Sequence, residues 1–196
     1  MARASLLRAA SRILAALGES EGALIGGLAV SAHGYVRATR DVDILVAIPL
    51  DEARRRLSAR GIASRIRRRD FFEGDFPVLK GYAGSVPFDI VSQLVPLEAD
   101  RVQSLEIGTL TLRIVDFETL ARLKLKAGSP KDLWDLAMLI LMDPARRPST
   151  FDLAASNPEL AERLRSYVDD PRAQREAAER ALDVPRRRTP ARKKHK

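Results

Sequence analysis

The stretch from Gly26 to Val46 reads GGLAVSAHGYVRATRDVDILV, and the rest of the chain is best understood as support for it. Its last part, after Asp43, is apolar and β-branched, which predicts a buried strand. Side chains alternate across a strand, so Asp41 and Asp43 are expected on the same side, with α-carbons roughly 6.5–7 Å apart. Two carboxylates at that separation repel unless a cation lies between them, and hard ions such as Mg2+ prefer oxygen ligands. The pattern therefore predicts a metal site at the start of this strand.

The pair Gly26-Gly27 follows a short apolar run and precedes a segment compatible with a helix. Glycine lets backbone N–H groups at a strand-to-helix turn approach an anion, and the helix directs its positive end toward that anion. A phosphate cradle followed by a metal-binding acid pair is a two-part site for a nucleotide. Each half alone also has an ordinary explanation, namely a tight turn and a chance pair of acids.

The order of these features resembles the first motif of the DNA polymerase β-like nucleotidyltransferases, in particular the minimal, AbiEii-type bacterial group. Arg37, Thr39, Asp41 and Asp43 match its pattern R-x-T-x-D-h-D-h, where h is an apolar residue. The resemblance implies that Arg37 and Thr39 bind the nucleotide and that the glycine pair holds the triphosphate. Many relatives have a serine where Gly27 stands, so a contact there would be through the backbone only. The resemblance covers roughly residues 20–142.

A third carboxylate, Asp89, lies in the apolar run Val86–Val91, which predicts a second buried strand. A lone acid in such a strand is costly unless it is paired or bound to a metal. The resemblance places the third metal ligand of the family at Asp89. It implies that Asp41, Asp43 and Asp89 hold two Mg2+ ions, with Mn2+ as an alternative. A buried salt bridge to one of the arginines is the other explanation for Asp89.

Two predicted helices in the second half supply further candidates. Asp116 is expected to cap the first, and Ser129-Pro130 to open the second. The resemblance implies that one lysine acts on charge in the reaction, while a second lysine and two aspartates belong to the nucleotide site. The aspartates are i,i+3 neighbours that could orient either lysine, although ordinary surface charge is the alternative. In chain order these candidates are Lys124, Lys131, Asp132 and Asp135.

Composition and hydropathy predict an α/β (α+β) protein. We expect a small mixed twisted sheet with flanking helices in residues 1–142, followed by a small helical cap in residues 143–184. The chain of 196 residues has no cysteine, which excludes disulfides and thiolate zinc sites. Its first 17 residues are expected to form a core helix and not a transit peptide. No apolar run reaches the ~18 residues of a membrane span, so we expect a cytoplasmic protein.

The net charge of +8 is unevenly distributed. Residues 185–196, PRRRTPARKKHK, contain no acid and predict either a disordered arm attracted to nucleic acid or a solubilising tail. A second basic cluster predicts either a solvated face or a surface for an RNA backbone. Its members are Arg54, Arg55, Arg56, Arg60, Arg65, Arg67, Arg68 and Arg69.

The residues and the resemblance together predict metal-dependent transfer of a nucleotide from an NTP to an acceptor hydroxyl. Relatives of the AbiEii type include toxins that modify tRNA ends, which implies RNA as the acceptor and an antitoxin as a partner. The alternative is a nucleotide- or RNA-binding protein that keeps the fold without turnover. Three clustered carboxylates argue against that alternative, because a site without turnover has no physical need for them.

Overall fold

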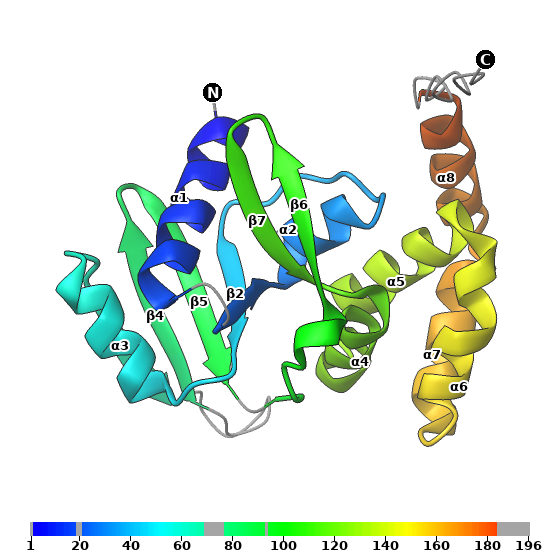
Figure 1. Ribbon diagram of the computed structural model, residues 1–196. Coiled ribbons are helices and arrows are strands. Elements are labelled where there is room, and N and C mark those ends of the chain that lie inside the picture. The colour runs from blue at the N-terminus through cyan, green and yellow to red at the C-terminus, as the bar shows by residue number, and fades with distance from the viewer. Residues whose placement is uncertain (1, 19–20, 69–76, 93, 184–196) are drawn as a thin grey trace, which may run out of the picture.

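The computed structural model describes residues 2–18, 21–68, 77–92 and 94–183. Its centre is a seven-stranded mixed sheet in the order β3-β4-β5-β2-β1-β7-β6 (Figure 1). The pairs β2–β5 and β1–β7 are parallel, and the other four are antiparallel. The strands are β1 (Gly22–Leu24), β2 (Val42–Val46), β3 (Ser64–Arg68), β4 (Pro77–Ala83), β5 (Val86–Ser92), β6 (Val102–Ile107) and β7 (Leu110–Val115).

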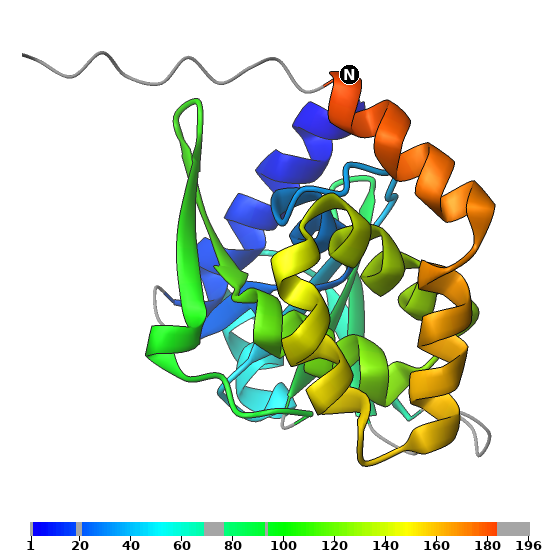
Figure 2. The ribbon, with the colours of Figure 1, turned by 90° about the vertical axis from the view of Figure 1, so that its right-hand side faces the viewer.

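Helices flank this sheet and extend beyond one side of it (Figures 1 and 2). They are α1 (Ala2–Leu17), α2 (Gly26–Ala32), α3 (Leu50–Ala59), α4 (Phe117–Ala127), α5 (Pro130–Met142), α6 (Arg147–Ala154), α7 (Pro158–Val168) and α8 (Pro171–Asp183). Helices α1 and α3 pack on one face of the sheet, and α2 packs against β2, β7 and α4. The predicted architecture of a mixed sheet with flanking helices and a helical C-terminal region is confirmed.

The apolar stripe of α1 explains how this face is covered. Leu6, Ala10, Ile13 and Leu17 repeat at helical spacing, and all four are buried in the main core. The helix ends before Gly18, whose φ of 110° only glycine adopts readily. Alternate residues of the central strands meet this helix, so their remaining side chains face the opposite side of the sheet.

The helices α4 and α5 form the link to the C-terminal region. The Asp116 side chain accepts from Thr119 N at 2.8 Å, and Gly128 takes the left-handed conformation after α4, as the sequence predicted. A second apolar core joins α4 and α5 to α6 and α7, with Leu136 and Leu164 fully buried in it. The predicted boundary at residue 142 coincides with the end of α5.

Two element boundaries differ from those that the sequence predicts, namely a helix that begins at Ser149 and a hairpin strand that begins at Leu105. Helix α6 begins at Arg147 and not at Ser149, because a 3-10 turn over Pro144–Arg146 leads directly into it. Strand β6 begins at Val102, three residues before the expected hairpin, because Val102 still pairs with Val115. No helix in the described part of the chain is both long and apolar enough to cross a membrane. The predicted basic tail, residues 185–196, lies outside the described residues.

Candidate active site

The predicted acids meet on the face of the sheet opposite α1. Strands β2 and β5 are parallel neighbours, and their register pairs Asp43 directly with Asp89. Asp41 precedes β2, and its Oδ1 accepts a hydrogen bond of 2.8 Å from Thr39 Oγ1. The sheet therefore brings together two acids that are 46 positions apart in the sequence and places the third beside them.

The glycine pair lies directly against these acids. Gly26 begins α2 with a φ of 59°, and a Cβ there would lie 1.9 Å from Asp43 Oδ2. A Cβ on Gly27 would lie 2.7 Å from Thr39 Oγ1. Side chains of the acid motif thus occupy the space that larger residues would need. The predicted phosphate cradle and the predicted metal site are adjacent.

The charge on Asp43 is poorly compensated. Burial raises the pKa of Asp43, and repulsion from Asp41 and Asp89 raises it further, to about 7. The charges of Lys131 and Lys124 act in the opposite direction. Lys131 is exposed in the first turn of α5, near enough for its charge to act on Asp43, and its predicted role at this site stays a prediction. A cation or proton near Asp43 is therefore favoured at neutral pH.

Behind the acids lies a compensated cluster centred on Asp135. This carboxylate is fully buried and accepts from Arg37 Nε at 2.6 Å and from Arg37 Nη2 at 2.8 Å. It also accepts from Lys124 Nζ at 2.7 Å. Arg37 uses Nη1 to bind the backbone carbonyl of Ala38. Arg37 and Asp135 are thus bonded to each other, and their predicted contact with a nucleotide stays a prediction.

Lys124 is buried at 4% exposure and shared between two carboxylates. Its second partner is Asp132 Oδ1 at 2.8 Å. Ser129 caps α5 by accepting from Asp132 N, and its hydroxyl donates to Asp132 Oδ2. The predicted orientation of a lysine by the two aspartates is confirmed for Lys124. The exposed Lys131 has no ion-pair partner among the described residues.

Lys80 is the site residue that the sequence did not indicate. It lies opposite Asp89 in the antiparallel pair β4–β5, and its Nζ donates to Asp89 Oδ2 at 2.5 Å. The alternative explanation for Asp89, a salt bridge to an arginine, is thus corrected, because the partner is a lysine. One sign of its position was present in the sequence. Lys80 and Tyr82 are two residues apart in β4, so their side chains lie on the same face of the sheet.

The fit to a metal follows from the donors and from their present partners. Three carboxylates supply the hard oxygen ligands that Mg2+ and Mn2+ prefer, and the raised pKa of Asp43 marks charge that a cation would compensate. Among the residues that the structure describes, no three Asp, Glu, His or Cys side chains are gathered at metal-binding spacing. The predicted convergence is therefore not preformed, because Asp89 is turned to Lys80 and Asp41 is bonded to Thr39.

The predicted arginine cluster divides between the two faces of the sheet. On α3, three arginines bond to Asp51 or Glu52 of the same helix. On β3, Arg65 and Arg67 are exposed on the other face, beside Lys80. The members of the cluster thus lie in different layers, because α3 packs on one face of the sheet and the β3 arginines lie on the other, and a role in RNA binding stays a prediction for Arg65 and Arg67. Arg69 lies outside the described residues.

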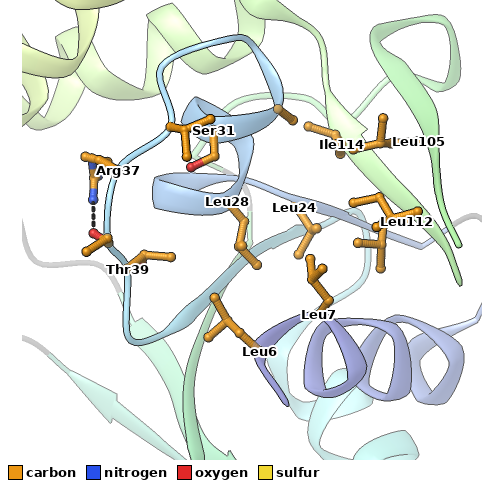
Figure 3. A pocket seen from close by; sticks show the side chains of 14 residues that line it. Leu6, Leu7, Leu24, Leu28, Ser31, Arg37, Thr39, Leu105, Leu112 and Ile114 are labelled. Atoms are coloured by element: carbon orange, nitrogen blue, oxygen red, sulfur yellow. Dashed lines mark hydrogen bonds between the residues drawn. The ribbon is translucent and has the colours of Figure 1, made fainter. Parts of the chain in front are cut away.

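An apolar cavity of about 520 Å³ opens on the α1 side of the sheet (Figure 3). Leucine and isoleucine side chains from α1, α2 and the β6–β7 hairpin line most of it, and Arg37 and Thr39 lie at one edge. None of the three acids contributes to its wall. The acids therefore lie outside this cavity, which meets the site only through the segment from Arg37 to Thr39.

Comparison with solved structures shows which known fold this architecture resembles. A candidate nucleotidyltransferase from Thermotoga maritima aligns with a TM-score of 0.52 and 15% identity, covering 65% of this chain and 88% of its own. The fold is nucleotidyltransferase-like. An antigenic nucleotidyltransferase-like protein from Paracoccidioides brasiliensis aligns with a TM-score of 0.49 and 16% identity, covering 86% and 95%. A candidate nucleotidyltransferase from H. pylori gives 0.46 and 18%, covering 92% and 88%. No family model and no curated protein matches the sequence.

Proposed function

We propose that this protein is a metal-dependent nucleotidyltransferase, which transfers a nucleoside monophosphate from an NTP to an acceptor hydroxyl. One observation carries the proposal: Asp43 is paired with Asp89 on neighbouring parallel strands against the Gly26 turn, and the charge of Asp43 is poorly compensated. Adjacent acids repel each other and lower the stability of the fold, and this cost is explained if they bind a cation. The nucleotidyltransferase-like fold supports the same function.

The roles of the acids and the glycines follow from their positions. Asp41, Asp43 and Asp89 would hold Mg2+ or Mn2+, which when bound polarises phosphoryl oxygens and lowers the pKa of the attacking hydroxyl. Backbone N–H groups at Gly26 and Gly27 would hold the triphosphate. The acceptor oxygen attacks the α-phosphorus, pyrophosphate leaves, and the hydroxyl proton passes to Asp89 or to water.

The two lysines of α4 and α5 would have different roles. Lys131 is exposed, and its charge would neutralise the phosphates of the bound NTP. Lys124 is buried with Asp132 and Asp135, so it would hold the base of the site and add a fixed positive charge behind Asp43. Arg37 would keep its loop, and with it Thr39, against the acids.

The finer parts of the proposal rest on the motifs and on charge. We assign the chain to the minimal, AbiEii-type group, with RNA or tRNA as the acceptor, an antitoxin as a partner and the cytoplasm as its location. The motif from Arg37 to Asp43 and the basic residues 185–196 support these assignments. Detection of modified RNA ends in cells that express the protein tests them.

One observation favours the alternative, a nucleotide-binding protein without turnover. Lys80 bonds to Asp89 and so competes with a metal for that carboxylate. Under this alternative the protein binds NTP, Mg2+ does not increase the affinity, and no nucleotide is incorporated. Calorimetry of NTP binding with and without Mg2+ distinguishes the two functions.

The decisive experiment is incubation with each α-labelled NTP, Mg2+ and total RNA. Asp43→Asn should lower incorporation at least about 100-fold, as expected when a group that stabilises transition-state charge is lost. Asp51→Asn is the matched control, because Asp51 is 66% exposed on α3 and lies on the other side of the sheet. Equal incorporation by the wild type and Asp43→Asn would reject the proposed site.

A further inference from the structure

A groove of about 420 Å³ extends over β3, β4 and β5, and Asp89 is part of its wall. Strand register places Arg65, Lys80, Asp89 and Asp43 in one row across four adjacent strands. Neighbouring strands are about 4.8 Å apart, so Arg65 lies roughly 10 Å from Asp89 along this row. The groove therefore leads from a basic end directly to the acid that faces the acceptor in the proposed reaction.

Within the part of the chain that the structure describes, no acid neutralises the basic end of the groove. Arg65 and Arg67 are exposed, and the described residues provide neither with an acidic partner. By contrast, Arg54 and Arg55 on α3 each bond to an acid of their own helix. Uncompensated arginines at the mouth of a groove attract anions, whereas paired ones contribute little field.

An exposed aromatic side chain lies in the same groove. Tyr82 is 66% exposed and follows Lys80 at the next position on this face of β4. An exposed aromatic ring beside cationic side chains is the combination that holds single-stranded nucleic acid, because a base stacks on the ring while phosphates meet the cations.

We infer that this groove binds the acceptor, and that the acceptor is the 3′ end of a single-stranded nucleic acid. The inference rests on the proposed function for the identity of the transferred group. The terminal hydroxyl lies at Asp89, a neighbouring base stacks on Tyr82, and preceding phosphates contact Lys80, Arg65 and Arg67. The phosphate that meets Lys80 draws this lysine away from Asp89, so acceptor binding frees the carboxylate for the reaction.

The chemistry of the groove also selects against other acceptors. A polycationic small molecule would be repelled by Arg65 and Arg67, which have no acids beside them in the described structure. A duplex keeps its bases stacked on one another and cannot offer one to Tyr82 without unpairing. A single strand satisfies both the charge and the ring.

The test is binding of a fluorescent single-stranded RNA with a free 3′ hydroxyl, measured by anisotropy with full-length protein at several salt concentrations and without NTP. Arg65→Ala combined with Arg67→Ala should weaken binding at least about tenfold. It should also reduce the slope of log K against log salt by about 1.4, since each single-strand phosphate contact contributes about 0.7. Tyr82→Ala should weaken binding about tenfold at an unchanged slope.

The matched control is Arg54→Ala combined with Arg55→Ala, which removes the same charge from the other face of the sheet. It should bind like the wild type, and Arg65→Lys with Arg67→Lys should keep most of the affinity. A duplex of the same sequence should bind more weakly and lose no affinity in Tyr82→Ala. Equal weakening by both arginine pairs would show that net charge alone drives binding and would overturn the inference, as would wild-type binding by the β3 variant.

A transfer assay separates this inference from the proposed function. If RNA binds through the groove but no nucleotide is incorporated, the proposed function fails and the groove remains a nucleic-acid site. If nucleotide is incorporated into RNA and the β3 variant raises neither KM for RNA nor the dissociation constant, the groove inference fails and the function remains. Circular dichroism spectra identical to those of the wild type establish that the exposed substitutions leave the fold intact.

Discussion

Two sets of aspartates lie within one site, and they are treated in opposite ways. Asp43 is repelled by Asp41 and Asp89, no cation bonds to it among the described residues, and its pKa is raised to about 7. Asp135 is more deeply buried, yet Arg37 and Lys124 both bond to it. Burial alone therefore does not decide whether a carboxylate has a counter-charge. That depends on which cationic side chains of the protein bond to it.

The difference assigns a separate task to each set. The Asp135 cluster joins the loop before β2 to α4 and α5, and its charges are satisfied within the protein. In the other set, the charge of Asp43 is poorly compensated and is repelled by Asp41 and Asp89. A fully paired cluster stabilises the arrangement, whereas an unpaired one has free energy to gain from a metal ion. Three measurements test this contrast.

The largest effect is expected at the compensated set. Asp135→Asn removes the shared partner of Arg37 and Lys124 and leaves buried positive charge without a full counter-charge. The free energy of unfolding should fall by about 3–5 kcal/mol. Urea denaturation followed by circular dichroism measures this change. Asp152→Asn, at an exposed position on α6, is the control and should change stability by less than about 0.5 kcal/mol. If Asp135→Asn lowered the free energy of unfolding as little as the control does, the proposed difference between the two sets would be wrong.

A change of opposite sign is expected at the uncompensated set. The pKa of Asp43 is raised from 3.8 to about 7, so between these pH values the folded state holds a proton that the unfolded state has released. The free energy of unfolding therefore falls as the pH rises from about 4 to about 7. The variant Asp43→Asn has no carboxyl group at this position, so its stability should not fall over this pH range. In a chelating buffer the variant should be more stable than the wild type by about 2–4 kcal/mol at pH 8 and nearly equal to it below pH 4.

Urea denaturation across this pH range measures the difference. Asp51→Asn should show no such pH-dependent gain, because Asp51 is exposed and lies away from the acids. A constant difference between the wild type and Asp43→Asn at every pH would show that the substitution acts through packing and not through charge.

The smallest effect is expected from the metal itself. Mg2+ at ten times its dissociation constant should stabilise the wild type by about 1.4 kcal/mol at pH 8. The gain should shrink at pH 6, where Asp43 holds its proton, and vanish in Asp43→Asn. Thermal melting with Mg2+, Mn2+ and chelator measures it without any substrate. Equal stabilisation of the wild type and of Asp43→Asn would place the metal elsewhere.

Local features of this molecule were predictable because their causes are local. Capping by Asp116 and Ser129 depends on residues three positions away, and the period of apolar residues in α1 depends on one helix. The Gly26 turn and the strand that follows Asp43 are likewise set by a few adjacent residues. The strand-helix order, and with it the motif, could thus be derived from the chain alone.

The partners of the site residues were decided by the tertiary structure. Arg37 and Asp135 are 98 positions apart, and only the packing of α5 against the loop before β2 brings them together. The sequence indicated a partner for Asp89 but not its identity, because strand order and register bring Lys80 opposite it. The same applies to Tyr35, whose hydroxyl donates to Glu176 of α8 and accepts from Trp134.

The sequence by itself determined which residues carry charge, where most elements begin and end, and that Asp43 and Asp89 belong to strands. Only the tertiary structure decided which of these charges are compensated. A local pattern specifies the face of a strand on which a side chain lies, but the neighbouring strand depends on long-range packing. For this reason Asp43 and Asp135 look alike in the sequence, and one is left open to a ligand while the other is sealed by Arg37 and Lys124.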